Sequence, residues 1–435
     1  MEPSINIVTM GCAKNEVDSQ EMTARLEAAG YRMVDDPAQA GAVIVNTCSF
    51  IQMATEESLD AVLQAAGLDN VANGRTHLVV SGCMPARYGD DLASELPEVA
   101  RFVPCSREDD IVAIMDGLFG DDAPQGARGD AAEEPYRPLA GQSPWTAYVR
   151  ISDGCDRFCS YCTIPYIRGR YHSYPESAIR ADVARKVHAG VKEITLIAQD
   201  TGRWGTDFER PSSLGALMDH LAGEFPDTWF RVMYIQPEGI SDDLLAAMAA
   251  HDNICSYLDI PVQHSVKRIL TAMNRKGSAS EYLALLDHVR RTVPNVTLRT
   301  TVIAGYPGET QEDVDDLCDF LEQAAFDYVG VFAYSREDGT RAASQPGQVD
   351  EAEKLDRAQQ VRDTADAVSA GVIAQRTGRV YDVLVLGREE DGQLFGRAQC
   401  QAPDVDGVTF LESGEPGQIV PVTITDTLMY EMEGE

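Results

Sequence analysis

The 435-residue chain is 44% hydrophobic and 24% charged, as in globular proteins, and its length suggests about three domains. Asp and Glu outnumber Lys and Arg by 70 to 36, and the net charge of −34 argues against a general nucleic-acid binder and favours basic partners. We find neither an apolar run of the roughly 20 residues that span a bilayer nor an N-terminal signal pattern, and therefore expect a cytoplasmic protein without a membrane partner.

The first 118 residues alternate short β-rich runs with helical stretches. The β-rich runs cover residues 5–10, 42–47, 77–81 and 101–104, and the helical stretches cover 17–29, 53–66, 85–96 and the segment that ends at Leu118. Strands separated by 10–15 residues of helical pattern predict an α/β fold with a doubly wound parallel sheet. Residues 119–144 are rich in Gly, Pro and acidic residues without periodicity, which predicts a linker.

Residues 145–375 show a second strand–helix alternation. We predict strands at 147–151, 193–198, 230–235, 257–261, 297–304 and 328–334, and a long helix at 351–375. Six such units suit a partial (β/α) barrel, whose active site lies at the C-terminal ends of its strands. From Arg376 to Glu435 the sequence changes to short β runs separated by Gly, which predicts a small β-barrel.

The clearest chemical motif follows the first strand of the predicted partial barrel. Cys155, Cys159 and Cys162 are spaced C-x3-C-x2-C, and the aromatic Tyr161 precedes the last of them. Clustered cysteines in the cytoplasm indicate metal ligands rather than disulfides. A 4Fe–4S cluster normally binds four thiolates, so three ligands would leave one iron open. A zinc-binding triplet is the alternative interpretation.

The motif and the fold around it resemble the radical-SAM superfamily over residues 145 to about 335. The resemblance implies that the open iron binds the amino and carboxylate groups of S-adenosylmethionine, whose cleavage yields a radical. It also implies that Tyr161 packs on the adenine and that the strand end with Ile303 and Gly305 lies against it. Further polar residues at strand ends are candidates for the cofactor or substrate pocket: Gln199, Asp200, Gln263 and His264.

Three other cysteines each follow one of the first three predicted strands. Cys12, Cys48 and Cys83 should therefore meet at one edge of the parallel sheet, where ligands bind. We expect them to hold a second 4Fe–4S cluster; buried structural cysteines are the alternative. The remaining cysteines fit neither motif and are interpreted as structural: Cys105, Cys255, Cys318 and Cys400.

The order of these three parts resembles the methylthiotransferases along the whole chain. The resemblance implies two S-adenosylmethionine molecules, one as methyl donor and one as source of the 5'-deoxyadenosyl radical, with the N-terminal cluster carrying the sulfur. A flavodoxin or ferredoxin is the expected electron donor. An alternative of another class is a noncatalytic iron–sulfur electron carrier or scaffold.

Two branches of that family differ in substrate. One modifies an adenosine in transfer RNA, and the other modifies the β-carbon of an aspartate in small-subunit ribosomal protein twelve. The segments 11–19 and 257–264 resemble the ribosomal-protein branch, although Ala13 stands where that branch usually has proline. The tail, which resembles a TRAM domain, has four Arg against 12 acidic residues, a net charge of −8. An acidic barrel suits a basic ribosomal protein and makes transfer RNA an unlikely partner.

Overall fold

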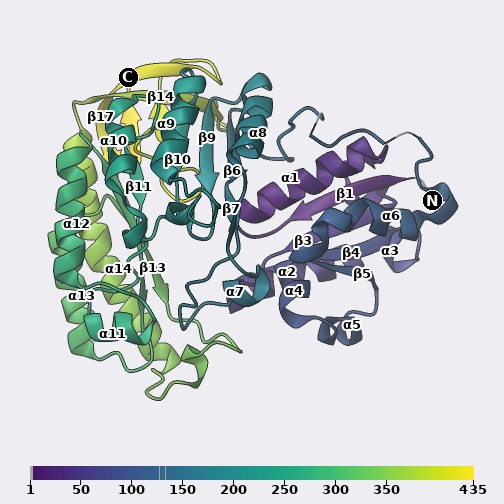
Figure 1. Ribbon diagram of the computed structural model, residues 1–435, viewed down its shortest axis with the longest axis horizontal. Helices are drawn as coiled ribbons and strands as arrows, with labels where there is room; N and C mark the ends of the chain where they lie inside the picture. Colours follow the sequence, from purple (N-terminus) through teal and green to yellow (C-terminus); the bar gives the residue numbers. More distant parts are fainter. Residues whose placement is uncertain (1–2, 127, 133) are drawn as a thin grey trace.

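The computed structural model describes residues 3–126, 128–132 and 134–435. Figure 1 shows the N-terminal unit beside a larger central unit, with the C-terminal strands in yellow packed on the central one. In the part of the chain that is described, no helix is both long and apolar enough to cross a membrane.

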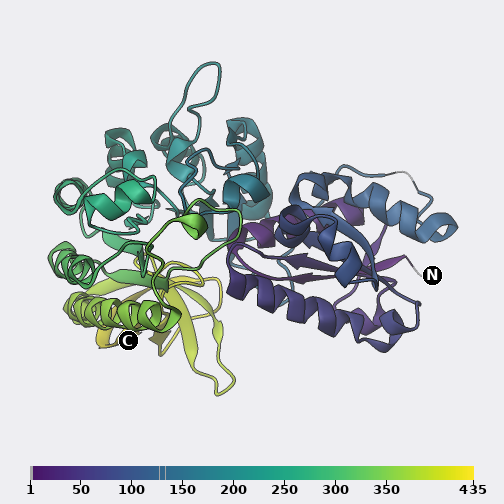
Figure 2. The same cartoon turned by 90° about the horizontal axis from the view of Figure 1, so that it is seen from below.

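The N-terminal unit is a parallel five-stranded sheet in the order β2-β1-β3-β4-β5. Its strands are β1 (Ser4–Thr9), β2 (Arg32–Met33), β3 (Ala42–Thr47), β4 (His77–Gly82) and β5 (Val99–Pro104). Its helices are α1 (Ala13–Ala28), α2 (Gln52–Ala66), α3 (Asp69–Ala72), α4 (Cys83–Tyr88), α5 (Asp91–Glu95) and α6 (Ile111–Phe119). Figure 2 shows helices on both sides of this sheet, which confirms the doubly wound prediction.

Alternation along the buried strands explains the two helical layers. Ile44 and Val79 pack in one apolar cluster with residues of α1 and α6, whereas Val43 and Val80 pack in another with residues of α2. Successive side chains of a strand point to opposite faces, so each face buries its own set. The helix expected over residues 85–96 is divided into α4 and α5, because Gly89 adopts a φ of +54° between them.

The central unit contains the six predicted parallel strands. They are β6 (Thr146–Arg150), β9 (Glu193–Ile197), β10 (Trp229–Val232), β11 (Tyr257–Asp259), β12 (Thr297–Ala304) and β13 (Tyr328–Ala333). They form two three-stranded sheets, β10-β9-β6 and β11-β12-β13, joined where Phe230 pairs with Ile254 and Ile235 donates to the carbonyl of Asp259. A short antiparallel pair, β7 (Ser152–Asp153) and β8 (His172–Ser173), follows β6.

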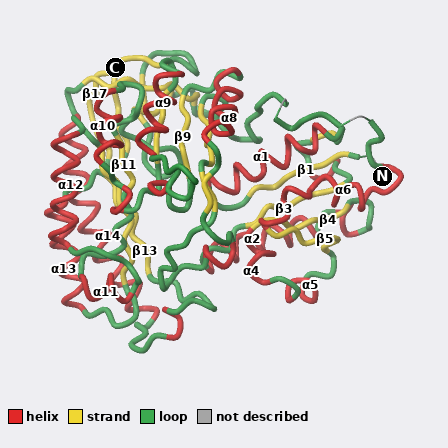
Figure 3. Tube along the Cα trace, in the orientation of Figure 1, coloured by secondary structure: helices red, strands yellow, loops and turns green. Residues whose placement is uncertain are grey.

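Helices cover the outside of this partial barrel, as the red coils of Figure 3 show. They are α8 (Glu176–His188), α9 (Leu214–Glu224), α10 (Asp242–Ala250), α11 (Lys267–Ala272), α12 (Ala279–Thr292), α13 (Gln311–Ala324) and α14 (Glu351–Ile373). A short helix, α7 (Ile164–Ile167), follows the C-x3-C-x2-C loop. The partial barrel therefore matches the arrangement predicted for the middle of the chain.

The C-terminal unit is a closed five-stranded barrel in the order β14-β15-β16-β18-β17. Its strands are β14 (Val380–Arg388), β15 (Leu394–Ala398), β16 (Thr409–Leu411), β17 (Ile419–Leu428) and β18 (Glu431–Gly434). This confirms the predicted small β-barrel. The barrel packs against the central unit where the central strands begin. Glu193, the first residue of β9, forms an ion pair with Arg231 at 2.7 Å and with Arg397, in β15 of the barrel, at 2.6 Å.

The N-terminal unit contacts the central unit through the start of α1. Ala13 and Val17 pack against Tyr148 of β6 and Ile197 of β9, with Tyr234 beside them. The helix that begins immediately after Cys12 is therefore seated against strands of the partial barrel. As a result, the sheet edge that carries the N-terminal cysteines faces the central unit.

Candidate functional site

Cys12, Cys48 and Cys83 lie at the ends of three neighbouring strands. Cys12 precedes α1, Cys48 follows β3, and Cys83 is the first residue of α4. Burial, together with the nearby Cys12 and Cys83, raises the pKa of the Cys48 thiol to about 12. The three thiols lie within electrostatic reach of one another, as expected for residues that follow neighbouring parallel strands.

Two glycines allow these turns to come together. A Cβ on Gly11 would lie 2.4 Å from the Cβ of Cys48, and one on Gly82 would lie 2.4 Å from Asn46 Oδ1 and from the carbonyl oxygen of Thr47. Both glycines also have φ near +95°, a conformation that other residues rarely adopt. Any larger residue at either position would push the cysteine turns apart.

Cys83 has a second thiol and a cation as neighbours. The Sγ atoms of Cys83 and Cys105 are 4.0 Å apart, and Arg168 Nη2 lies 3.6 Å from Cys83 Sγ. The hydrogen bond from Cys105 and the nearby Arg168 outweigh the opposing effect of burial and together lower the pKa of Cys83 to about 6. From the sequence, Cys105 was interpreted as structural because it fits neither cysteine motif. In the structure, however, Cys105 follows β5 at the same edge of the sheet.

The loop with Cys155, Cys159 and Cys162 is held by backbone contacts from two directions. Ser160 donates its N–H to the carbonyl of Met273 (2.9 Å) and accepts from the N–H of Ala342 (2.8 Å). Asn274 Nδ2 donates to the carbonyls of Arg157 and Phe158 at 2.9 and 3.1 Å. These contacts fix the loop at the C-terminal ends of the strands, where the sequence placed it.

The three thiols of this loop are also electrostatic neighbours. Burial raises the pKa of Cys162, with Cys159 and Cys155 as further causes, and it also raises the pKa of Cys155. Arg275 Nη1 lies 4.0 Å from Cys159 Sγ. Within residues 3–126, 128–132 and 134–435, no three His, Cys, Asp or Glu side chains are grouped as ligands of a single metal ion. A four-iron cluster needs a wider spacing, since its thiolates bind separate iron atoms.

Four of the predicted cofactor residues lie beside the cysteine loop or its apolar surroundings. Tyr161 and Ile303 pack against one apolar cluster, which contains Met273 and Tyr306. Asp200 is fully buried and accepts from Arg157 Nε at 2.6 Å. Gln199 Nε2 donates to Asp153 Oδ1 at 2.9 Å, and its buried Oε1 has no hydrogen-bond partner among the described residues.

Two of the other three predicted residues, His264 and Gly305, contact Glu309. His264 is fully buried: its Nδ1 accepts from two backbone N–H groups at 3.0 Å, and its Nε2 lies 3.4 Å from Glu309 Oε2. The N–H of Gly305 donates to Glu309 Oε1 at 2.8 Å, and a Cβ on Gly305 would lie 2.6 Å from Lys354 Cγ. Gln263, at a φ of +70°, pairs through its backbone with β12. Contacts within the protein therefore account for the positions of all three residues.

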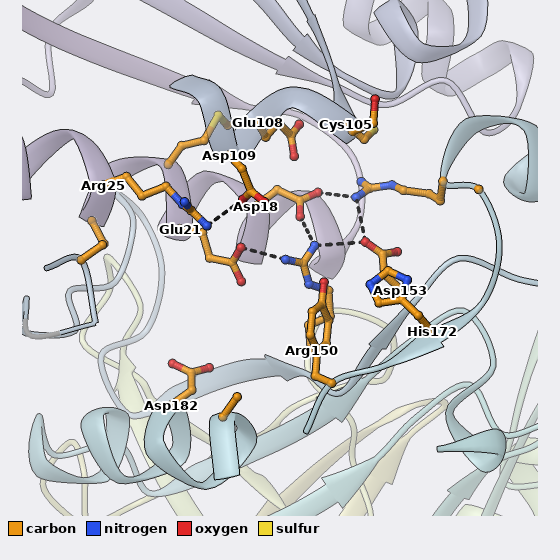
Figure 4. A pocket seen from close by; sticks show the side chains of 18 of the residues that line it. Asp18, Glu21, Arg25, Cys105, Glu108, Asp109, Arg150, Asp153, His172 and Asp182 are labelled. Carbon is orange, nitrogen blue, oxygen red and sulfur yellow. Dashed lines mark hydrogen bonds and ion pairs between the residues drawn. The ribbon is translucent and has the colours of Figure 1, made fainter. Parts of the chain in front are cut away.

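An ion network that was not predicted from the sequence joins α1 to the segments before and after the C-x3-C-x2-C loop. Asp18 of α1, 1% exposed, contacts Arg168 at 2.6 Å and Arg150 at 2.5 Å. Lys14 Nζ lies 2.9 Å from Asp153 Oδ1, and burial lowers the pKa of this lysine. Figure 4 shows Arg150 between the carboxylates of Glu21 and Asp18.

The network borders a cavity of about 1120 Å³ between the N-terminal and central units, which Cys105 and Arg168 also line. The charged residues of α1 could have been noted in the sequence as part of the segment 11–19. Arg168 has no comparable signal, because it lies in an unpatterned stretch after the cysteine loop. It reaches Asp18 and Cys83 only through the folded contact between the units.

Three families match successive parts of the chain. Residues 4–104 match Uncharacterized protein family UPF0004, residues 149–321 match the Radical SAM superfamily, and residues 377–435 match the TRAM domain. These segments coincide with the N-terminal sheet, most of the partial barrel and the C-terminal barrel. The exact domain limits given above remain predictions.

Curated relatives match the chain over almost its whole length. The ribosomal protein uS12 methylthiotransferase RimO of Trichlorobacter lovleyi is 40% identical over 438 residues, covering 99% of this chain and 97% of the relative. Proteins of the same name from Pelobacter propionicus and Pelotomaculum thermopropionicum are 40% and 39% identical, with 99% of this chain covered in each case.

Solved structures share the fold at low identity. The radical S-adenosylmethionine methyltransferase TsrM from Kitasatospora setae, solved with tryptophan and a cofactor analogue, gives a TM-score of 0.57 at 12% identity. The match covers 84% of this chain and 89% of that one. The cobalamin-dependent radical enzyme OxsB gives a TM-score of 0.52 at 12% identity, covering 84% of this chain and 56% of that one.

Proposed function

This chain belongs to the RimO family of radical SAM methylthiotransferases, and from that membership we propose that it attaches a methylthio group to ribosomal protein uS12. The observation that carries the proposal is identity of 37–40% to proteins of that name over essentially the entire chain. As acceptor atom we propose the β-carbon of an aspartate of uS12, and as co-substrate two S-adenosylmethionine molecules.

We assign one 4Fe–4S cluster to Cys155, Cys159 and Cys162 and a second to Cys12, Cys48 and Cys83. The donor sets fit: each offers three neighbouring thiols, and Gly11 and Gly82 leave the space in which the N-terminal turns converge. When bound, the clusters and S-adenosylmethionine supply the radical and the sulfur that no side chain can provide.

The chain's own residues would position these groups. The apolar surface of Tyr161 and Ile303 suits an adenine ring beside the cysteine loop. The Asp200–Arg157 pair and Arg275 hold charged groups at fixed positions around Cys155 and Cys159. Gln199 keeps a buried amide oxygen available to accept from a cofactor donor.

Arg168 would connect the two sites. It lies on the segment that follows Cys162, yet its guanidinium contacts Asp18 and lies beside Cys83 of the other triad. A cation next to a thiolate favours the charged form that iron requires. Because Asp18 and Arg168 are 1% and 3% exposed, this link excludes water and holds the two sites in a fixed relation.

The C-terminal barrel supports a protein substrate over transfer RNA. Two of its four arginines form buried ion pairs with the central unit: Arg397 with Glu193 and Arg376 with Asp327. Its exposed surface is therefore even more acidic than the net charge of −8 indicates. Such a surface repels phosphates and complements the basic surface expected of a ribosomal protein.

Mass spectrometry of ribosomal proteins and transfer RNA from a strain lacking this gene tests the proposal. We expect uS12 to lose the mass of one methylthio group and the transfer RNA to keep its modifications. Restoring the gene should restore the group, and a Cys155→Ala copy should not. If only the transfer RNA loses a methylthio group, the assigned substrate is wrong.

A further inference from the structure

Four cysteines, rather than three, lie at the cysteine-bearing edge of the N-terminal sheet. Cys105 follows β5 just as Cys83 follows β4, and the two strands pair in parallel with Gly82 opposite Pro104. Cys83 and Cys105 directly follow this pair and therefore lie side by side at the ends of adjacent strands. Neighbouring strands lie about 4.8 Å apart, within the Cα separation of about 4.4–6.8 Å that a disulfide spans.

The two thiols already face each other. Their Sγ atoms are 4.0 Å apart, so the two sulfurs need to approach by only about 2 Å to reach the bonding distance of about 2.0 Å. Cys105 is half-buried and lines the 1120 Å³ cavity between the units, whereas Cys83 is 4% exposed. A small oxidant in the cavity therefore meets Cys105 first.

We propose that Cys83 and Cys105 are a reversible oxidation site that forms a disulfide in the cluster-free chain and withholds a ligand from the N-terminal cluster. The oxidant is a low-molecular-weight disulfide such as glutathione disulfide. The Cys83 thiolate accepts the proton of Cys105, whose sulfur attacks the oxidant to give a mixed disulfide and a glutathione thiolate. That thiolate takes the proton back from Cys83 and leaves as reduced glutathione. The Cys83 thiolate then attacks the Cys105 sulfur, forms the protein disulfide and releases the second glutathione. The two cysteines are oxidised, and glutathione disulfide is reduced.

The consequence for the enzyme rests on the proposed function, in which Cys83 is a cluster ligand. While the disulfide persists, the N-terminal site keeps only Cys12 and Cys48, and the loop of Cys155 is unaffected. Reduction by a dithiol returns Cys83 and permits loading. The pair would thus protect an empty site from irreversible thiol oxidation and make its loading depend on the redox state of the cell.

The test uses the full chain, freed of iron by anaerobic chelation, reduced, and equilibrated with glutathione disulfide. Free thiols are then alkylated, and cross-linked peptides are identified by mass spectrometry. We expect a Cys83–Cys105 peptide from the unmodified chain and from Cys318→Ser, a control that removes a buried thiol of α13 outside both triads. Cys105→Ser should lose the peptide. Recovery of Cys83 as a free thiol, or joined mainly to Cys12 or Cys48, would overturn the proposal.

Iron content after anaerobic reconstitution separates this inference from the proposed function. The oxidised chain should bind about four iron atoms fewer than the reduced chain. Dithiothreitol should restore them, and Cys105→Ser should load equally from both samples. A disulfide that forms without altering iron content would sustain the oxidation site but refute Cys83 as a cluster ligand. Normal iron loading without any Cys83–Cys105 disulfide would refute the oxidation site and leave Cys83 as a cluster ligand.

Discussion

Replacing Glu193 by Gln should detach the C-terminal barrel from the central unit. Glu193 is fully buried between Arg231 and Arg397, at 2.7 and 2.6 Å, and both arginines are at most 5% exposed. Burial alone would raise the pKa of this carboxyl, but Arg397 and Arg231 outweigh it and the pKa is lowered. Glutamine keeps the shape and removes the charge, leaving two guanidinium groups buried without a counter-ion.

Breaking a buried ion pair in this way costs about 3–5 kcal/mol, equivalent to roughly a 100-fold or larger shift in the unfolding equilibrium. Urea denaturation followed by circular dichroism measures the loss, and hydrogen exchange in β14 and β15 shows whether the barrel opens first. The exposed Arg388→Met in the same barrel is the control, with an expected change below about 0.5 kcal/mol.

A double variant checks the cause. Adding Arg397→Met to Glu193→Gln removes one uncompensated charge. The double variant should therefore lose less unfolding free energy than the sum of the two single variants. Since folding lowers the pKa of Glu193, its contribution is complete above about pH 4.3, the unfolded value, and is lost as the pH falls toward the folded one. A cost below about 1 kcal/mol for Glu193→Gln, or strict additivity, would refute the reasoning.

Three further predictions concern the cysteine sites and their surroundings. Cys155→Ala should abolish release of 5'-deoxyadenosine in the reconstituted protein while Cys48→Ala retains it and stops methylthio transfer; equal loss in both variants would contradict two separate sites. Gly82→Ala should lower the unfolding free energy by about 2 kcal/mol more than Gly74→Ala, since both have positive φ but only Gly82 lacks space for a Cβ; equal costs in urea titrations would count against the close approach. Burial, assisted by Asp404, raises the pKa of Glu16 to about 7, so thermal stability should fall as the pH rises from about 4.3, the unfolded pKa, to about 7 and should level off above that. Glu16→Gln should flatten this dependence, and an unchanged slope would exclude Glu16 as its source.

Much of the fold could be predicted because its signals are local. The strands at 42–47 and 297–304 were placed to the residue, since continuous apolar or β-branched runs end at clear turn residues. The individual strands of the C-terminal barrel were not placed in this way, because strands as short as β16 and β18 are ordered by closure of the barrel. The convergence of Cys12, Cys48 and Cys83 followed from the rule that parallel strands end at one edge.

What could not be predicted depends on contacts between distant segments. Arg168 meets Asp18 across 150 residues of sequence, and Cys105 meets Cys83 because β5 pairs with β4. The same applies to His264, whose side chain accepts from its own turn and contacts Glu309. A single polar residue at a strand end does not reveal whether it faces a ligand or a neighbouring helix, and the cofactor contacts remain predictions for that reason.

The buried triad of Arg231, Glu193 and Arg397 also limits how this protein can be recombined with its relatives. A chimera with a foreign C-terminal barrel that lacks a matching arginine would leave Glu193 with a single counter-ion. A foreign central unit that lacks the glutamate would leave Arg397 buried without a counter-ion. Chimeras designed to change the substrate should therefore keep both the glutamate of the central unit and the arginine of the barrel. Otherwise a chimera that fails to fold would be mistaken for one with the wrong specificity.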